Sequence, residues 1–465
     1  MRRIKTWTLR LGSTLGVVFV VALLGTVSPI DDRPFLLQPY HQSTLNRLDN
    51  APSWPSSFTG PARAGFARVE LTPQLVSSNP APASGRFTSI PLAGYGARSG
   101  KPATGSLDPL WVKAVALETR EYRIVWIAID ALIIPREVTE IVINELARDP
   151  GLSREELYLG ATHTHGSLGG WGEGLVAEAF AGPFTPGVRD WMAGCIVAAT
   201  RQALGDLAPV KVGSGSFQAP GQIRNRLVQE AGRTDAEFSL LKFERADGSS
   251  AVIGAFGAHA TVLGADNMLF SGDYPGAWAR QVEQSTGTTA LFIAGGVGSH
   301  SARSGNGSPT ERVENLGRQL ALDTIQALAR IPTSPEVLLT TIGLPVDLPE
   351  TNIRFADDFR LRPWIGRQLV PTGSDTFLQA VRINDAIWVS TPCDFSGELA
   401  LTLKEHACTL GRNLTVTSFN GDYIGYVIPS KYYHLGGYEP QTMSFFGPSL
   451  PDYFEDLIRR MMAGL

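Results

Sequence analysis

The sequence is poor in cysteine and in charge for its length. Three widely spaced cysteines among 465 residues exclude a disulfide framework and a cysteine-based zinc ribbon. We expect Cys195, Cys393 and Cys408 to lie in the core, where cysteine is most often found. Charged residues make up 18% of the chain and the formal net charge is −4, so no basic surface is expected and nucleic acid is not a predicted partner. The 43% hydrophobic content indicates a globular protein with a large core.

One long uncharged segment stands out near the amino terminus. Four basic residues within the first ten precede the run 11–30, which ends at Asp31. Twenty residues can just cross a bilayer core of about 30 Å, and the basic flank predicts a cytoplasmic amino terminus with the body outside. A cleaved signal peptide is the alternative and would give a secreted or periplasmic protein, but no clean small-x-small cleavage site ends the run. We favour the membrane anchor, which makes the membrane surface a predicted partner.

The remainder is predicted to be one α/β domain after a linker. Residues 31–65 are rich in Pro, Ser and Asn without periodicity, which is typical of a linker or wrapping segment. Residues 66–465 contain no repeat of fixed period, and apolar strand-like runs alternate with helical patterns. The predicted strands are 111–117, 123–129, 157–162, 251–256, 290–294, 385–390 and 413–418, and the predicted helices are 136–147, 188–204, 275–283, 311–329, 395–407 and 450–462.

A pair of histidines follows the strand predicted at 157–162. His163 and His165 lie two positions apart, so in an extended segment their side chains point to the same side. Imidazole is a common zinc ligand and also a proton carrier at neutral pH. The alternative is an ordinary loop with two hydrogen-bonded histidines, because a lone His-x-His has a substantial false-positive rate.

Other predicted strands also end in residues with reactive side chains. His259, Asp394 and Tyr426 follow buried strands or lie in glycine-rich loops beyond them. Side chains from the carboxyl ends of separate strands are how α/β sheets build sites, and two imidazoles with a carboxylate suit zinc with an open position. Asp130 also ends a strand, where it either ties a loop or supports such a site.

Two further loops contain candidates of a weaker kind. The glycine-rich loop 295–308 follows a strand and precedes a helix, so Ser301 or Ser299 could be a nucleophile, and His300 could equally be the functional residue. The Gly-x-Ser-x-Gly pattern is absent, and a merely flexible loop is the alternative. Arg224 and Arg226 lie in a polar loop that is either a solvated face or a site for an anion or carbonyl oxygen.

Several segments together resemble the neutral/alkaline non-lysosomal ceramidase family. The resemblance spans roughly residues 66 to 465 and matches in order and spacing. The segments are PLAGYGAR at 91–98, DPLWVKAVAL at 108–117, ATHTHGS at 161–167, FGAHATVLG at 256–264, SGDYPG at 271–276, TPCDFSGE at 391–398, GDYIGY at 421–426 and GYEP at 437–440.

This resemblance implies a fold, an activity and a set of site residues. It implies an α/β domain of mixed β-sheets sandwiched by helices, with a Zn²⁺ site at the strand ends. The implied activity is hydrolysis of the N-acyl amide of a ceramide-like lipid, releasing sphingosine and fatty acid. The residues that match the family's zinc ligands are His163, His259, Asp394 and Tyr426. Those that match residues around the scissile carbonyl are His165, Arg226 (with Arg224 as the nearby alternative) and Tyr438, and Ser301 matches the family's serine.

The sequence also departs from the family pattern. Asp394 stands where the family typically has Glu, and the family's Gly-Asp-Val-Ser-Pro-Asn segment reads Gly-Ser-His-Ser-Ala-Arg at 298–303. The family's carboxy-terminal immunoglobulin-like domain is expected to be absent, because the sequence closes on the predicted helix 450–462. These departures keep two alternatives open, namely a zinc hydrolase of another amide or ester and a catalytically silent binding homologue.

Overall fold

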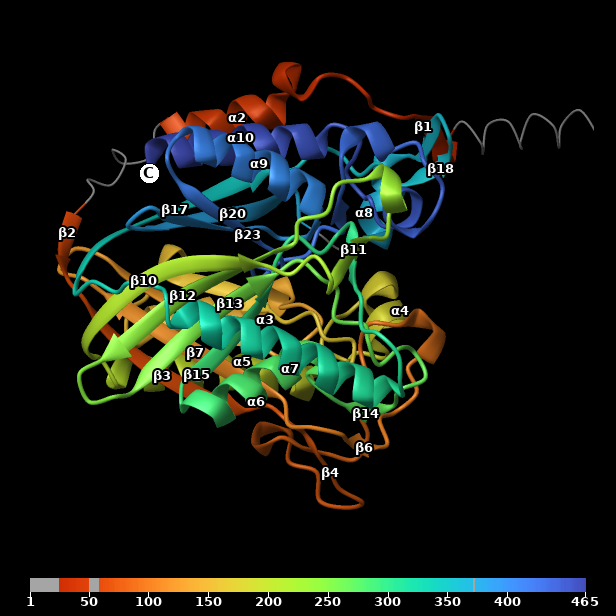
Figure 1. Ribbon diagram of the computed structural model, residues 1–465. Helices are drawn as coiled ribbons and strands as arrows, with labels where there is room; N and C mark the ends of the chain where they lie inside the picture. The colour runs from red at the N-terminus through yellow and green to blue at the C-terminus, as the bar shows by residue number, and fades with distance from the viewer. Residues whose placement is uncertain (1–24, 50–57, 371–372) are drawn as a thin grey trace, which may run out of the picture.

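Two β-sheets pack face to face between layers of helices in the computed structural model, which describes residues 25–49, 58–370 and 373–465 (Figure 1). The larger sheet has eight strands in the order β15 (Thr289–Ala294), β13 (Ser250–Phe256), β12 (Glu237–Arg245), β10 (Ala208–Gln218), β3 (Arg63–Glu70), β7 (Trp111–Glu118), β8 (Arg123–Ile129) and β9 (Leu157–Ala161). The smaller sheet has five strands in the order β2 (Phe58–Pro61), β17 (Glu336–Asp347), β20 (Asp375–Ile383), β21 (Ala386–Ser390) and β23 (Asn413–Thr417). The predicted α/β sandwich is confirmed.

Helices cover the outer face of each sheet. Those over the larger sheet are α3 (Arg136–Arg148), α5 (Pro186–Gly205), α6 (Asp273–Thr286) and α7 (Pro309–Leu328), and those over the smaller sheet are α2 (Pro39–Asp49), α9 (Gly397–Thr409) and α10 (Leu450–Gly464) (Figure 1). The shorter helices α4 (Leu175–Ala181) and α8 (Pro363–Leu369) lie near one end of the sandwich (Figure 1). The predicted helices therefore exist, with ends that shift by a few residues.

Minor pairs of strands complete the fold. They are β4 (Gln74–Leu75) with β5 (Arg86–Phe87), β6 (Gly105–Ser106) with β14 (Leu269–Phe270), β11 (Ile223–Asn225) with β16 (His300–Ala302), and β22 (Asp394–Phe395) with β24 (Tyr426–Val427). A three-stranded sheet in the order β1 (Val27–Pro29), β19 (Phe359–Leu361) and β18 (Arg354–Ala356) lies at the edge of the molecule (Figure 1).

The core between the two sheets is aromatic. Trp126 of β8 and Tyr158 of β9 point toward the smaller sheet, where Tyr158 contacts Trp388 with 6.4 Å between ring centroids. All three side chains are fully buried, as expected for strands with apolar residues on both faces. Burial of such large side chains holds the two sheets in a fixed relative position.

The packing of the sheets brings separate strand ends together. A Cβ added at Gly160 of β9 would lie 2.5 Å from Ile293 of β15, so the two outermost strands of the larger sheet approach one another closely. The Ser418 N–H, just beyond β23, donates to the carbonyl oxygen of Ala294 at the end of β15, with 2.9 Å between N and O. The carboxyl ends of β9, β13, β15, β21 and β23 therefore surround one region.

Parts of the amino-terminal segment differ from the sequence prediction. Most of the predicted anchor lies outside the described residues, but Val27–Pro29 at its end form β1. The predicted linker contains helix α2, which contacts β17, and strand β2. Polar and proline-rich composition hid these elements, whose stability comes from packing on the body. Among the described residues, no helix is both long and apolar enough to cross a membrane.

Two smaller expectations are settled by the structure. Cys195 and Cys393 are buried as predicted, but Cys408 is exposed near the end of α9, so its placement in the core was wrong. Asp130 accepts a hydrogen bond from the Trp111 N–H at 2.8 Å. Its carboxylate ties two strand ends.

Candidate metal centre

The four residues predicted as metal ligands meet at the junction of the two sheets. His163 lies two residues beyond β9, and His259 lies three residues beyond β13. Asp394 and Tyr426 are directly paired in the parallel strands β22 and β24. The larger sheet thus supplies the two imidazoles, while loops beyond the smaller sheet supply the carboxylate and the phenol.

The two imidazoles face each other through bare nitrogens. His163 Nδ1 lies 2.7 Å from the Leu132 carbonyl oxygen, and His259 Nδ1 lies 3.2 Å from the Val297 carbonyl oxygen. Because a carbonyl only accepts, each Nδ1 carries the proton. Burial lowers the pKa of His163 to about 3 and that of His259 well below its usual value, so both rings are neutral. The Nε2 lone pairs therefore oppose each other at 2.8 Å, an arrangement that a bound cation would stabilise.

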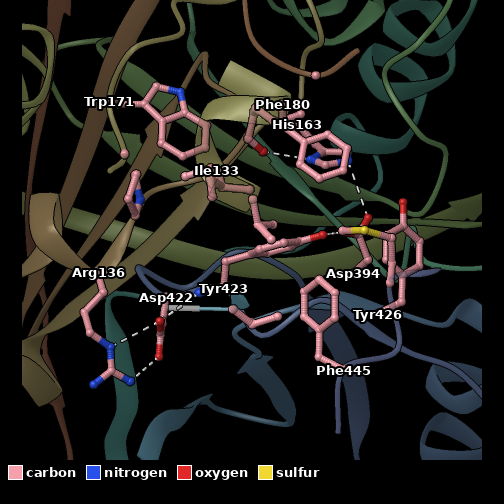
Figure 2. Close-up of a pocket in the computed structure, with 18 of the residues that line it drawn as sticks. Ile133, Arg136, His163, Trp171, Phe180, Asp394, Asp422, Tyr423, Tyr426 and Phe445 are labelled. Carbon is pink, nitrogen blue, oxygen red and sulfur yellow. Dashed lines mark hydrogen bonds and ion pairs between the residues drawn. The ribbon is translucent and has the colours of Figure 1, made fainter. Parts of the chain in front are cut away.

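A carboxylate oxygen without a partner completes this arrangement. Asp394 Oδ1 lies 3.4 Å from His163 Nε2 and 3.7 Å from His259 Nε2, and it is buried without a hydrogen bond. Its other oxygen, Oδ2, accepts from the Tyr423 hydroxyl at 2.8 Å (Figure 2). Burial is the main cause that raises the pKa of Asp394, to about 7. An orphaned carboxylate oxygen beside two imidazole lone pairs fits the donor set of a zinc site.

Two residues at the centre have a strained backbone conformation. His163 has φ of +60° and Phe419 has φ of +66°, a region that residues other than glycine rarely adopt. Their rings stack with 4.1 Å between centroids. Such strain persists where the surrounding packing over-determines a conformation, and it gathers at functional sites.

Tyr426 connects the centre to a buried arginine. The Tyr426 hydroxyl lies 3.4 Å from His259 Nε2 and accepts from Arg226 Nη2 at 3.0 Å. Arg226 also forms an ion pair with Glu439, with 2.9 Å between Nε and Oε1. Tyr438 has 42% of its surface exposed and its ring lies 5.7 Å from that of Tyr426. Arg226, Tyr426 and Tyr438 thus lie on one side of the centre.

His165 lies beside the centre with both ring nitrogens buried and without a hydrogen-bond partner. Its ring centroid is 5.0 Å from that of His163, and ligand atoms of His163, His165 and His259 all lie within 4.8 Å of one another. A side chain at Gly94, where φ is +108°, would collide with the His165 ring. The glycine-rich loop 91–98 therefore approaches the site closely.

A cavity of about 870 Å³, including its open mouth, leads to the centre. Its walls are mostly apolar, and Figure 2 shows Ile133 and Tyr423 between the centre and the ion pair of Arg136 with Asp422. His163, His165, Asp394, Tyr426 and Tyr438 all line this space. An apolar group can therefore lie against the walls while a polar bond reaches the histidines.

The backbone of Ser301 forms a parallel bridge with that of His259, but its hydroxyl contacts Arg224 and not the centre. Ser301 lies in β16 opposite Arg224 of β11, and its hydroxyl oxygen accepts from Arg224 Nε at 3.1 Å. Neither residue is among the described residues that line the cavity. Of the two candidate arginines, the structure brings Arg226 to the centre and places Arg224 with the serine.

The other serine of this loop belongs to a buried network. Ser299 Oγ lies 2.9 Å from His300 Nδ1 and 2.8 Å from Ser396 Oγ. His300 Nε2 accepts from the Asp235 N–H at 3.1 Å, so the His300 proton is on Nδ1. A histidine that donates to Ser299 cannot take that serine's proton, and we interpret this serine–histidine cluster (Ser299, His300 and Ser396) as structural.

Sequence reasoning missed Tyr423 and the two carbonyl groups that orient the histidines. Tyr423 belongs to the segment 421–426, where a concentration of tyrosines in a glycine-rich loop was the available signal. The carbonyl groups of Leu132 and Val297 leave no mark in the sequence, because any residue supplies one.

A sequence model of the neutral/alkaline non-lysosomal ceramidase family, N-terminal region, matches residues 80–313, half of the chain. The protein belongs to this family. A neutral ceramidase of Mycobacterium tuberculosis is 29% identical over 174 residues, which cover 34% of this chain and 27% of that protein. The match therefore spans about a quarter of the curated relative.

Solved ceramidase structures share the fold. The crystal structure of neutral ceramidase from Pseudomonas aeruginosa superposes with a TM-score of 0.73 at 18% identity, covering 86% of this chain and 74% of that one. A ceramidase complexed with C2 gives a TM-score of 0.73 at 19% identity, covering 86% and 75%. The predicted fold of this ceramidase-family protein is thereby confirmed.

Proposed function

We propose that this protein is a zinc-dependent amidohydrolase that cleaves the N-acyl bond of a ceramide-like lipid to a sphingoid base and a fatty acid. Family membership supports the reaction class. The observation that supports the metal is the pair of opposed Nε2 lone pairs of His163 and His259 beside the orphaned Asp394 Oδ1. The apolar cavity that ends at these atoms supports a lipid substrate.

The proposed ligands are His163, His259, Asp394 and Tyr426. Bound zinc supplies Lewis acidity, which polarises a carbonyl and lowers the pKa of water. Arg226 contacts Tyr426 by a charge-assisted hydrogen bond, which holds the phenol oxygen toward the centre. Tyr423 fixes one oxygen of Asp394, so only Oδ1 faces the histidines. The shorter Asp side chain thereby presents one defined oxygen.

The remaining residues act on the amide. We assign to Tyr438 and Arg226, which both lie beside Tyr426, donation to the carbonyl oxygen as negative charge develops on it. His165 is neutral because burial lowers its pKa, so it can accept the proton of the attacking water and deliver it to the leaving nitrogen. Ser301 has no role in this scheme, since its hydroxyl lies with Arg224 outside the cavity lining.

The test combines metal content with hydrolysis of a fluorescent N-acylsphingosine by the purified full chain. We expect stoichiometric zinc and turnover, both lost in His163→Ala. Zinc without turnover of this substrate would contradict the ceramide assignment and favour the second candidate, a zinc hydrolase of another amide or ester. That candidate is favoured by the altered segment 298–303. Absence of zinc would contradict the enzyme and leave a silent binding homologue.

We also propose that the part of the uncharged run 11–30 that precedes β1 holds the catalytic body at the outer side of the cytoplasmic membrane. The uncharged segment after a basic flank supports this placement. The expected result is that the protein stays in the membrane fraction after an alkaline carbonate wash. Recovery in the soluble fraction with a new amino terminus would instead identify a cleaved signal peptide and a secreted or periplasmic protein.

A further inference from the structure

The three-stranded sheet β1-β19-β18 has two chemically different faces. Pairing is antiparallel, with Val27 opposite Leu361, Pro29 opposite Phe359, and Arg354 opposite Arg360. Directly opposite residues share a face, and neighbours along a strand alternate between faces. One face, which we call the apolar face, therefore contains Val27, Pro29, Phe359 and Leu361. The register of β18 shifts between Arg354 and Ala356, and we include Phe355 in the apolar face because its side chain is exposed where that of Arg354 is buried.

The opposite face is fixed to the protein. Arg354 and Arg360 are both buried, and their guanidinium groups donate to the carbonyl oxygens of Leu435 and Thr351. Because these two arginines point inward, the apolar face points outward. Phe355 has 63% of its surface exposed and Phe359 has 47%. Exposed apolar side chains gathered on one face indicate an interaction surface rather than scattered surface residues.

The apolar face continues toward the mouth of the cavity. Helix α8 begins two residues after β19, and it carries Trp364 with 52% of its surface exposed. Val370, which directly follows α8, lines the cavity. Tyr438 lines the same cavity and is itself partly exposed. The sheet, Trp364 and one wall of the cavity thus follow one another along the chain from β19 to Val370.

The chain that precedes this sheet identifies the occupant. Residues 11–24 contain no charged side chain, and β1 begins at Val27. The junction is held to the body, because the Arg362 N–H donates to the Thr26 carbonyl at 2.8 Å and Trp364 Nε1 donates to that of Gly25 at 3.3 Å. A segment suited to lipid therefore enters the fold within a few residues of the exposed aromatic side chains.

We propose that the apolar face, together with Trp364, docks on a lipid bilayer and presents the cavity mouth to it. Phe and Trp side chains suit the boundary between headgroups and acyl chains. The turn between β18 and β19 contains the exposed Asp357 and Asp358. Because charged side chains are costly to bury among acyl chains, the contact reaches only the boundary between headgroups and acyl chains. If the proposed function holds, the lipid amide enters from the bilayer and not from water. The contact itself does not depend on catalysis.

A fluorophore attached through Phe359→Cys in the full chain, with Cys408→Ser to remove the exposed thiol, tests the contact. The protein is reconstituted into phosphatidylcholine vesicles that contain lipids brominated on the upper acyl chain. The control label is placed through Leu322→Cys on α7, where the side chain is 55% exposed. We expect strong quenching at position 359 and none at position 322. An equal extent of quenching by the brominated lipids at both positions would overturn the proposal.

A second measurement compares hydrolysis rates of the double variant Phe355→Ser, Phe359→Ser with those of the control variant Leu322→Ser. We expect about tenfold slower hydrolysis of a long-chain lipid amide in vesicles, with hydrolysis of a monomeric short-chain amide unchanged. Equal loss on both substrates would overturn the proposal, as would a dimer of the native chain that the double variant abolishes, because a second copy would then cover the face. If the native chain hydrolyses neither substrate, the proposed function fails while the quenching result still decides the contact.

Discussion

Two histidine clusters lie within the same sandwich and differ in how their polar atoms are satisfied. In the serine–histidine cluster, both nitrogens of His300 have partners, and Ser299 joins Ser396 in a closed network. In the candidate metal centre, the Nε2 atoms of His163 and His259 face each other and Asp394 Oδ1 has no partner. Both clusters are buried, so burial alone does not distinguish them. Unmet ligand atoms beside a cavity mark the functional cluster, because leaving such atoms unpaired costs free energy that a fold without function would avoid.

The largest contrast is expected between His163→Ala and its matched control His300→Ala. The first removes a ligand and should abolish both zinc binding and hydrolysis, with little change in the fold of the metal-free protein. The second removes buried hydrogen bonds and should lower the free energy of unfolding by about 1–3 kcal/mol while zinc content is kept. Metal analysis and chemical denaturation measure the two effects. Zinc retained by His163→Ala would show that His163 is not a ligand.

A variant of His165 tests whether this residue belongs to the zinc ligands. If it transfers protons and does not bind zinc, His165→Gln should lower kcat by about 10²- to 10⁴-fold while zinc stays stoichiometric. Kinetics and metal analysis on the same preparation check this. Loss of zinc together with activity would instead place His165 among the ligands, with His163 and His259.

The raised pKa of Asp394 predicts that the free energy of unfolding of the metal-free protein depends on pH. Burial raises the pKa of this carboxyl from 3.8 to about 7, so the folded state holds a proton that the unfolded state loses above pH 3.8. Stability therefore falls as pH rises through this window, by a few kcal/mol on an order-of-magnitude basis. With a chelator present, Asp394→Asn should be more stable than the native protein at pH 8 and lose most of that advantage near pH 4. If Asp394→Asn and the native protein had the same midpoint of denaturation at pH 8, burial of the ionised carboxylate would not destabilise the metal-free fold.

Tyr423 links the cavity wall to the metal centre, and its loss should have an intermediate effect. Tyr423→Phe keeps the ring but removes the hydrogen bond to Asp394 Oδ2, so zinc affinity should fall by about 10- to 100-fold. Tyr433→Phe is the matched control, since the Tyr433 hydroxyl donates to the Asn352 carbonyl away from the centre. Competition with a chromogenic chelator measures both affinities. Equal affinities in the two variants would remove Tyr423 from the account.

The smallest effect is expected at Ser301. Ser301→Ala removes a hydroxyl that contacts Arg224 outside the cavity lining. The free energy of unfolding should change by no more than about 0.5 kcal/mol, and zinc content and hydrolysis should stay as in the native protein. Steady-state kinetics provide the check. A large loss of kcat with normal zinc would restore Ser301 as a nucleophile.

The strands that deliver the site could be predicted from the sequence because they are continuous apolar runs. The runs ahead of His163 and His259 are buried on both faces, and such runs stand out in any sequence. The ligand set came from the family resemblance, and the structure brings all four residues together. Sequence alone did not show that Ser301 pairs with Arg224, nor that Tyr423 reaches Asp394, because those contacts depend on how two sheets pack.

In the amino-terminal region, by contrast, the sequence did not predict the strands and the helix that the structure contains. The composition of this region predicts a linker, yet Val27–Pro29 and Phe58–Pro61 are strands of two sheets and Pro39–Asp49 is a helix. The β-strands are edge strands whose partners lie some three hundred residues away in sequence. Local propensity carries no information on such pairing, since tertiary contacts supply most of the stability.

Zinc is proposed to lie between His163, His259 and Asp394. A crystal structure with anomalous diffraction recorded on both sides of the zinc absorption edge tests it most directly. We expect an anomalous peak at about 2.0–2.2 Å from His163 Nε2, His259 Nε2 and Asp394 Oδ1. A peak bound by His165 with Asp394 Oδ1 still unpartnered, or crystals of zinc-loaded protein with no peak at this junction, would contradict it.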